Sequence, residues 1–420
     1  MTQVRVILLA LLVVLSVPVA AISGAAPAQT DQSADRTQQA AQMATPANTT
    51  ATLSLDSVPA SAFQEAEPDI SATLDVQQRE LDARYTEYAL DERFQELESE
   101  ENRSELLLNV TGQLEARIDA LREEERQSRL AYVRGDITAA EYVATLGRID
   151  AEAREIEALL GRFAGEYAYF SQVPAVSDHV VERFEEKLAT LQGPVREDVG
   201  RALQGEVDGD RVWVGASRNG VVLSTIRGGQ YVSEAYRADH FNPDQSDTAV
   251  SANTLATRLI QDGLGAELYP WGWNTNHINL RGLEHVVYFQ FTHEHGEVTA
   301  YVDGTSQEVY REYQTKTLRD IPTTPAVTNR SEDLDFQVAV NQTYAGGPLR
   351  VAVTNETGSP KTAEILVGGT YVGTTGTNGV VWTVGGAGTY NVTARRGGES
   401  LNVTVRALAP KPVGSVNGTT

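Results

Sequence analysis

The sequence predicts a multidomain protein with an N-terminal α-helical hairpin or coiled coil, a central α+β region and a C-terminal all-β sandwich. Between residues 71 and 193 apolar side chains recur every three or four positions, which is the spacing of one helix face. After residue 205 the apolar period falls to two, and beyond residue 333 glycine pairs separate short alternating runs. A chain of 420 residues is long enough for such an arrangement.

Residues 1–28 have the layout of a secretory signal peptide. One arginine precedes an apolar run that ends in small residues, and Ala-Pro-Ala at 26–28 predicts cleavage after Ala28. The alternative is an uncleaved N-terminal membrane anchor, because the apolar run at 6–22 is marginal in length for a span. Both alternatives predict that the rest of the chain is extracellular or belongs to the cell envelope.

Residues 29–70 are rich in Ala, Gln, Thr and Ser and predict a disordered linker, whereas 71–193 predict a helical hairpin or small bundle. Thr138 and Glu141 form a capping box that starts a new helix after a break at 134–136. Helices separated by a short break fold back on each other and bury their apolar seams, although the seams could also face a second chain. The expected seams are Leu146, Ile149, Ala153, Ile156, Leu160, Phe163 and Tyr167; Leu107, Val110, Leu114, Ile118 and Leu121; and, more weakly, Leu81, Tyr85 and Tyr88.

Residues 194–320 predict two tandem α-β-β-β units. The first has a helix near 198–203 and strands at 211–217, 220–226 and 230–236, and the second a helix at 251–260 and strands at 285–291, 297–302 and 307–313. The last strands resemble each other, with SEAYR at 233–237 and QEVYR at 307–311.

The C-terminal part of the chain is predicted to contain a linker at residues 321–333, an Ig-like β-sandwich at 334–407 and a disordered tail at 408–420.

The second α-β-β-β unit resembles a PepSY-type domain over about residues 250–315. The resemblance lies in its final hairpin, Val302-Asp-Gly-Thr-Ser-Gln-Glu-Val309, and departs from the family pattern where Gly304 follows Asp303 directly. PepSY-like modules are extracytoplasmic binding or regulatory units that often accompany proteases. The resemblance therefore implies a binding role without catalysis.

The C-terminal region resembles the carboxypeptidase-regulatory, Ig-like sandwich modules of surface proteins. The similarity rests on Gly369-Thr-Tyr-Val-Gly, on Asn378-Gly-Val-Val-Trp382 and on Ala387-Gly-Thr-Tyr-Asn-Val-Thr-Ala394. The order of regions in the whole chain is similar to that of secreted proteins of halophilic archaea. Fold-level similarity does not by itself give a function.

Composition narrows the class of partner. The chain has 57 acidic and 34 basic residues and a net charge of −23, and its few lysines are Lys187, Lys316, Lys361 and Lys411. Many carboxylates with few lysines are typical of proteins that work in concentrated salt, and the net negative charge argues against binding nucleic acid.

The chain has no cysteine, which excludes disulfides and thiolate metal sites. Sequons for N-glycosylation start at Asn48, Asn102, Asn109, Asn329, Asn341, Asn355, Asn391, Asn402 and Asn417.

The histidines do not predict a metal site. His285 and His293 fall on one face of an expected strand but are about 26 Å apart at ~3.3 Å per residue, too far to share an ion. His293, Glu294 and His295 do not make a closed ligand set, and His240 or His277 would have to complete it. An acidic loop with Asp239, Asn242, Asp244 and Asp247 lacks the spacing of a calcium loop. We therefore predict no metal, no cofactor and no catalytic residues.

The stretch Tyr-Pro-Trp-Gly-Trp at 269–273 is the candidate binding site. Trp271 and Trp273 could form an exposed aromatic platform for a glycan or a peptide, or both indoles could fill the core between a helix and the sheet. These features predict a secreted or envelope-associated, non-enzymatic binding or structural protein of a halophile. A regulator or inhibitor of an extracellular protease is the alternative, and a metal-dependent hydrolase the remote one.

Overall fold

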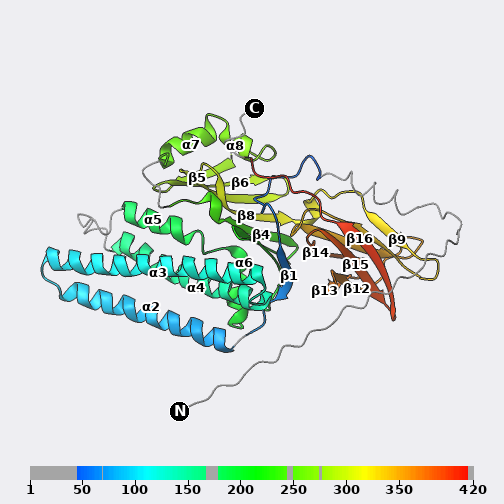
Figure 1. Ribbon diagram of the computed structural model, residues 1–420, viewed down its shortest axis with the longest axis horizontal. Helices are drawn as coiled ribbons and strands as arrows, with labels where there is room; N and C mark the ends of the chain where they lie inside the picture. Colours follow the sequence, from blue (N-terminus) through cyan, green and yellow to red (C-terminus); the bar gives the residue numbers. More distant parts are fainter. Residues whose placement is uncertain (1–44, 69, 167–177, 244–248, 274–276, 415–420) are drawn as a thin grey trace, which may run out of the picture. The chain divides into compact units, whose positions relative to one another are not determined.

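The computed structural model describes residues 45–68, 70–166, 178–243, 249–273 and 277–414 (Figure 1). The predicted signal peptide lies outside these residues. The α-helices are α2 (Ile70–Glu96), α3 (Glu100–Arg134), α4 (Ala139–Glu166), α5 (Asp178–Leu188), α6 (Pro194–Leu203), α7 (Ala252–Ile260) and α8 (Leu264–Leu268), and the 3-10 turns are η3 (Ala238–His240) and η6 (Leu318–Asp320).

Helices α3 and α4 form the predicted antiparallel hairpin. Gly135 ends α3 in the left-handed region (φ 79°), where glycine has no Cβ penalty. The Thr138 N–H donates to Glu141 Oε2 at 2.7 Å and the Glu141 N–H donates back to Thr138 Oγ1 at 3.2 Å, which is the expected capping box. The two seams are buried together at Leu107, Ile118, Leu121, Leu146, Ile149, Ala153, Ile156 and Leu160.

The weaker seam of α2 is oriented differently from the prediction. Leu81, Tyr85 and Tyr88 were expected to face the hairpin, but they point to solvent. Among the α2 side chains that the structure describes, Leu90 and Phe94, nearer its C-terminal end, enter the core between the helices. At the other end of α2 the Thr73 hydroxyl donates to the Leu203 carbonyl of α6 at 2.9 Å, so that α2 contacts the rest of the fold near both of its ends.

The two predicted α-β-β-β units share one antiparallel sheet. Its strands are β1 (Ala60–Glu65), β2 (Arg211–Ala216), β3 (Gly220–Arg227), β4 (Gln230–Arg237), β5 (Ile278–Gly282), β6 (Val286–His293), β7 (Gly296–Asp303) and β8 (Val309–Thr317), in the order β1-β2-β3-β4-β8-β7-β6-β5. The units meet where β4 pairs with β8, with Tyr236 opposite Arg311. The segment 233–237 and the last three residues of 307–311 therefore lie on the two central strands of the sheet.

The linker predicted at 29–70 is ordered in its described part. Strand β1 pairs with β2 along its whole length, from Ala60 opposite Ala216 to Glu65 opposite Arg211. Before it, Ala51 and Leu53 are buried in the core formed with α7 and α8. Few large apolar residues are needed here, because the segment completes an existing sheet and core and does not build one of its own.

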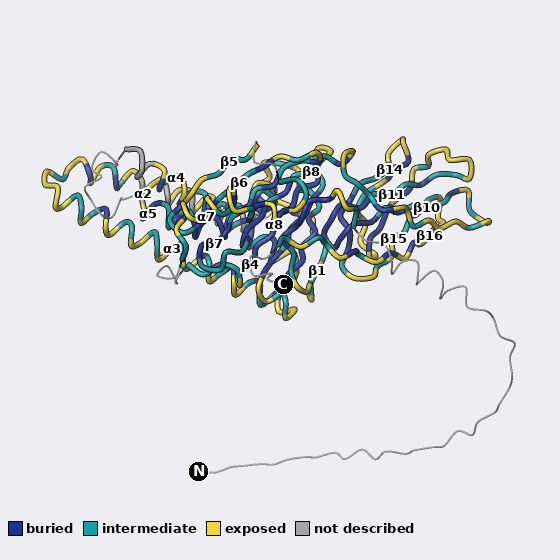
Figure 2. Tube along the Cα trace, turned by 90° about the horizontal axis from the view of Figure 1, so that it is seen from above, coloured by how far each residue is buried: buried dark blue, intermediate teal, exposed yellow. Residues whose placement is uncertain are grey.

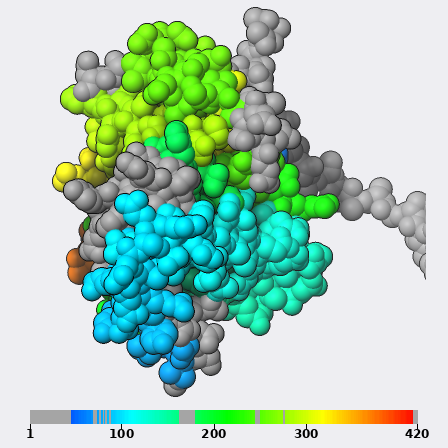
Figure 3. All heavy atoms as spheres, turned by 90° about the vertical axis from the view of Figure 1, so that its left-hand side faces the viewer, coloured from blue at the N-terminus to red at the C-terminus, as the bar shows by residue number. Residues whose placement is uncertain are grey.

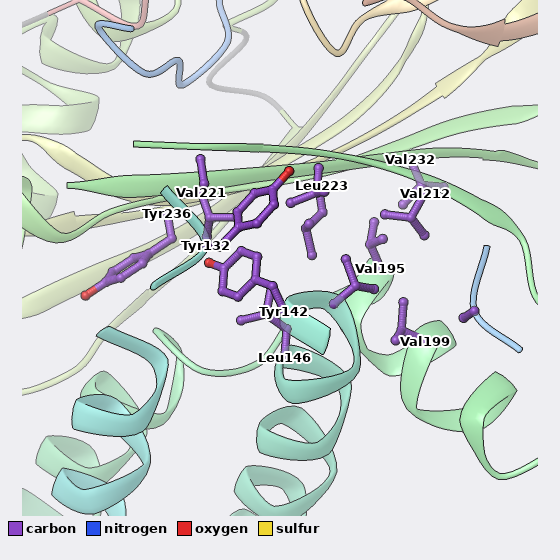
Figure 4. Close-up of a cluster of buried hydrophobic side chains, with 14 of the residues drawn as sticks. Tyr132, Tyr142, Leu146, Val195, Val199, Val212, Val221, Leu223, Val232 and Tyr236 are labelled. Atoms are coloured by element: carbon purple, nitrogen blue, oxygen red, sulfur yellow. The ribbon is translucent and has the colours of Figure 1, made fainter. Parts of the chain in front are cut away.

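Apolar cores lie on both faces of the sheet. On one face α3, α4 and α6 pack against β2, β3 and β4, and the stacked rings of Tyr132 and Tyr142, 5.0 Å apart, close the hairpin over the strands (Figure 4). On the other face α7 and α8 cover β6, β7 and β8. The first core crosses the boundary expected between residues 193 and 194. Figure 2 shows that buried residues concentrate in the strands.

The C-terminal region is a sandwich of two four-stranded sheets. One has the order β14-β11-β10-β9 and the other β13-β12-β15-β16. Phe336, Val351 and Val392 are among the residues buried between them. The strands are β9 (Val327–Arg330), β10 (Gln337–Asn341), β11 (Pro348–Thr354), β12 (Glu364–Val367), β13 (Thr370–Thr374), β14 (Val380–Val384), β15 (Thr389–Arg396) and β16 (Glu399–Arg406).

Both segments that flank the sandwich are more ordered than predicted. The expected linker at 321–333 contains β9, which pairs with β10. The expected disordered tail packs through Leu408, which is buried and donates its N–H to the Thr343 carbonyl at 2.9 Å, and Gly414 donates to the Leu268 carbonyl at 3.0 Å. Single apolar residues and backbone hydrogen bonds suffice to hold a chain that lies on existing structure.

Candidate functional site

The loop after α8 places Trp271 against the turn between β6 and β7. Its indole stacks on the His295 ring, with centroids 4.8 Å apart and planes 15° apart, and meets His293 edge-on at 5.5 Å. Tyr269 anchors the start of the loop, because it is fully buried and its hydroxyl donates to Glu312 at 2.6 Å. Gly272 follows at a positive φ of 98°, which lets the chain turn back over the strands. Trp271 remains half-buried.

Trp273 is also half-buried and packs against the core formed with α7 and α8. Its ring meets Phe289 and Phe291 edge-on, with centroids 5.2 and 5.5 Å away. It also lies so close to Gly265 of α8 that a Cβ there would come within 1.9 Å of the indole. Of the two predicted roles, the contacts of Trp273 fit the core-filling one, and Trp271 lies at the margin with one ring face on histidine.

Burial keeps both histidines of this turn neutral near pH 7. Removal from water, with the nearby Lys316 charge, lowers the pKa of His293 to about 3 and also lowers the pKa of His295. The His293 ring accepts a hydrogen bond at Nδ1 from the His295 N–H at 3.2 Å. The stack of Trp271 on His295 is thus a contact between neutral aromatic rings.

The remaining histidines are dispersed. His285 precedes β6 and His293 ends it, so the strand separates them as predicted. His240 contacts the Val309 carbonyl through Nδ1 at 2.8 Å, and His277 is exposed. Among the described residues no group of three or more His, Asp or Glu side chains could hold a metal ion. In the acidic loop Asp239 pairs with Arg237 at 2.7 Å, whereas Asp244 and Asp247 lie outside the described residues.

Buried charges on β8 form a polar cluster that sequence reasoning missed. The Glu312 carboxylate accepts the Leu53 N–H at 3.0 Å, the Gln314 amide at 2.8 Å and the Tyr269 hydroxyl. Burial raises the pKa of Glu312 to about 7, partly offset by these donors. Lys316, two positions beyond Gln314, is also buried. Glu312, Gln314 and Lys316 lie at every second position of β8 and therefore on one strand face, and this polar pattern is visible in the sequence.

A second buried cluster joins the helices to the opposite face of the sheet. Glu234 of β4 contacts Arg196 at 2.9 Å and Arg311 at 3.2 Å, and accepts the Val195 N–H of the first turn of α6 at 3.0 Å.

On α5, Glu186 accepts the N–H groups of His285 and Val286 at 2.6 and 3.1 Å. Burial raises the pKa of Glu186 to about 7. These carboxylates connect elements of the fold to one another.

Helix α2 carries an apolar stripe on its solvent side, which we call the α2 stripe. It consists of Leu74, Leu81, Tyr85 and Tyr88, with 60, 62, 75 and 68 % of each residue exposed. Three of its members are seven residues apart, so that they lie on one face of the helix. Figure 3 looks onto the part of the surface that α2 and α3 occupy, in blue and cyan.

The predicted glycosylation sites differ in accessibility. Exposed sequon asparagines are Asn48, Asn102, Asn109, Asn329, Asn391 and Asn402. Asn341 and Asn355 are half-buried, and the Asn341 amide donates to the Thr324 carbonyl at 2.9 Å. Asn417 lies outside the described residues. In the described part of the chain, no helix is both long and apolar enough to cross a membrane.

Three family models match successive parts of the chain. Residues 1–208 match a domain of unknown function (DUF7096), residues 212–322 a family of unknown function (DUF7094), and residues 327–403 an archaeal fibronectin-III type-like domain. Comparisons with curated proteins and with solved structures gave no match. The third match covers β9 to β15 and most of β16, and it names a fibronectin-III type-like sandwich where the sequence resembled carboxypeptidase-regulatory modules. The matches are consistent with an archaeal protein that ends in an Ig-like β-sandwich.

Proposed function

We propose that this is a secreted or envelope-associated, non-enzymatic binding and structural protein that self-associates through the α2 stripe. The observation that carries the proposal is the exposure of Leu74, Leu81, Tyr85 and Tyr88 on one face of a helix whose neighbours bury their own seams. Leaving four large apolar side chains in water forgoes the stabilisation that burial would give, roughly 1.5–3 kcal/mol for each fully buried side chain.

A second copy of the chain is the proposed occupant of the stripe. Apolar residues seven positions apart on a helix pack against an equivalent helix as in a coiled coil, and a two-fold axis would let each stripe cover the other. Tyr88 lies fourteen positions after Leu74, which corresponds to about 21 Å of helix at 1.5 Å per residue. In concentrated salt the acidic surfaces of the two copies would repel each other less.

A non-enzymatic role agrees with the use of the buried ionisable groups. Glu186, Glu234 and Glu312 each accept hydrogen bonds from backbone N–H groups that belong to another element of the fold. A carboxylate occupied in this way holds elements together and has less freedom to act on a substrate. The sandwich would serve as a stalk or adhesion module of the assembled protein, in a halophile's envelope, with the exposed sequons as glycan acceptors.

Oligomeric state tests the proposal. The chain from residue 29, expressed with Leu81→Glu and Tyr88→Glu, is expected to sediment as a monomer where the unsubstituted chain sediments as a dimer, both in high salt. Ile260→Glu on α7 is the matched control, because Ile260 is also an exposed apolar helix residue, 45 % exposed. A monomer at all concentrations for the unsubstituted chain would contradict self-association.

A second candidate role is regulation of an extracellular protease through the α+β region. It is favoured by the PepSY resemblance and by Trp271, a large aromatic side chain that is only half-buried. A pull-down from native envelope extract in high salt, with Trp271→Ala as the comparison, tests it. Capture of a protease that the substitution abolishes would support regulation, and capture of surface-layer proteins or glycans would support the structural role.

A further inference from the structure

A small, partly open cavity is lined by the buried residue Lys316. Its volume is about 10 Å³, and its lining includes Thr49, Thr50, His295, Lys316 and Tyr344. It forms where residues 45–50, which we call the N-terminal segment, meet the β7–β8 hairpin and the connection between β10 and β11 of the sandwich. A cavity of this size has room for one occupant about as large as a water molecule, and it excludes sulfate, phosphate and organic carboxylates.

The ammonium group of Lys316 is buried without a carboxylate in ion-pair contact among the described residues, although the charge of Glu312 on the same strand favours its protonated form. The residue is 3 % exposed. Its Nζ donates to the Tyr344 hydroxyl at 3.3 Å and lies 6.0 and 5.7 Å from the ring centroids of Tyr231 and Tyr344. An ammonium has three N–H donors, so this environment leaves donors without an acceptor.

Two threonines that line the cavity offer further donors. The side-chain hydroxyls of Thr49 and Thr50 are buried and have no hydrogen-bond partner. The nearest buried carboxylate on the same strand, Glu312, is already engaged by Leu53, Tyr269 and Gln314. The Lys316 ammonium and the unpartnered hydroxyls of Thr49 and Thr50 therefore surround a space in which a negatively charged hydrogen-bond acceptor would be stabilised.

We propose that this cavity binds a single small monovalent anion of halide size, held by Lys316, Thr49 and Thr50. The anion neutralises a buried cation and fixes the N-terminal segment to the β7–β8 hairpin and to Tyr344 of the sandwich. Burial lowers the pKa of Lys316, and a bound anion opposes that effect by favouring the charged form. The site is independent of the α2 stripe and of the proposed self-association.

Thermal unfolding at constant sodium concentration tests the site, with chloride replaced stepwise by methanesulfonate, which is too large for the cavity. The unsubstituted chain is expected to show a saturable rise in Tm with chloride of about 2 °C or more, because a ligand that binds only the native state stabilises it. Lys316→Met is expected to abolish the rise, while Lys361→Met, at a lysine paired with Asp335 near the surface, keeps it. Equal chloride dependence in all three chains would overturn the proposal.

A direct measurement remains decisive if Lys316→Met fails to fold. Crystals of the unsubstituted chain grown in sodium bromide are expected to show an anomalous peak between Lys316 Nζ and the hydroxyls of Thr49 and Thr50. A water molecule or an empty cavity at that position, in the presence of bromide, would refute the anion site.

Discussion

The guanidinium of Arg196 lies 2.9 Å from the carboxylate of Glu234, and both side chains are almost completely removed from solvent. The same carboxylate accepts the Val195 N–H and contacts Arg311. The Glu234 side chain thus joins the first turn of α6 to β4 and β8, the two central strands of the sheet. Removing one partner of such a pair leaves an uncompensated buried charge, which is costly.

We therefore expect Glu234→Gln to lower the free energy of unfolding by about 3–5 kcal/mol. Urea unfolding followed by circular dichroism measures the change. Glu65→Gln is the control, because Glu65 pairs with Arg211 at the sheet edge with its side chain 47 % exposed, and an exposed pair contributes about 0–1 kcal/mol. Similar losses for the two variants would show that burial of the pair is not what matters.

Helices α4 and α6 approach each other through glycines. A Cβ on Gly147 would lie 2.8 Å from the Val199 side chain and 2.9 Å from the Gly200 nitrogen, so the helices would have to separate. We expect Gly147→Ala to destabilise the protein by about 1–3 kcal/mol despite alanine's better helix propensity. Gly112→Ala in α3, where a Cβ meets nothing within 4 Å, should instead stabilise it by up to about 1 kcal/mol. Thermal melts of both variants distinguish the two effects.

Glu312 predicts a dependence of stability on pH. Burial raises its pKa from 4.5 to about 7, so the folded state binds the proton more tightly than the unfolded state does. The stability contributed by this group is full below pH 4.5 and is lost as the pH rises through 7. Glu312→Gln is expected to remove a decline of about 3 kcal/mol between pH 4 and 8. Urea titrations across that range test it, with exposed Glu332→Gln as the control; an unchanged slope for Glu312→Gln would contradict the assignment.

His293 acts on stability with the opposite sign. Its pKa is lowered from 6.5 to about 3, so the stability that depends on the neutral ring is present above pH 6.5 and is lost as the pH falls below it. His293→Asn keeps a side-chain acceptor near the His295 N–H and removes the titration. The difference in unfolding midpoint between this variant and the unsubstituted chain is expected to shrink from pH 7 to pH 4. A difference that stays constant over this range would exclude the effect.

Local patterns in the sequence determined most of the secondary structure. The 3-4 spacing from Leu146 to Leu160 and the Thr138–Glu141 box identify a helix and its start, and the alternating runs after residue 205 identify strands. These signals are local because helix periodicity, capping and strand alternation depend on neighbouring residues. The similarity of SEAYR and QEVYR also indicated two related units.

Only the tertiary structure decided which of these elements share a core and which charges are buried. Residues 45–68 and 408–414 gain order by lying on a sheet and a sandwich formed elsewhere in the chain, so their own composition predicted disorder. Leu81, Tyr85 and Tyr88 have the spacing of a buried seam but are exposed, whereas Leu90 and Phe94 of the same helix enter the core with α3 and α4. Lys316, Glu312 and the pair of Arg196 with Glu234 become interior groups only when distant segments close around them, and no local pattern encodes that closure.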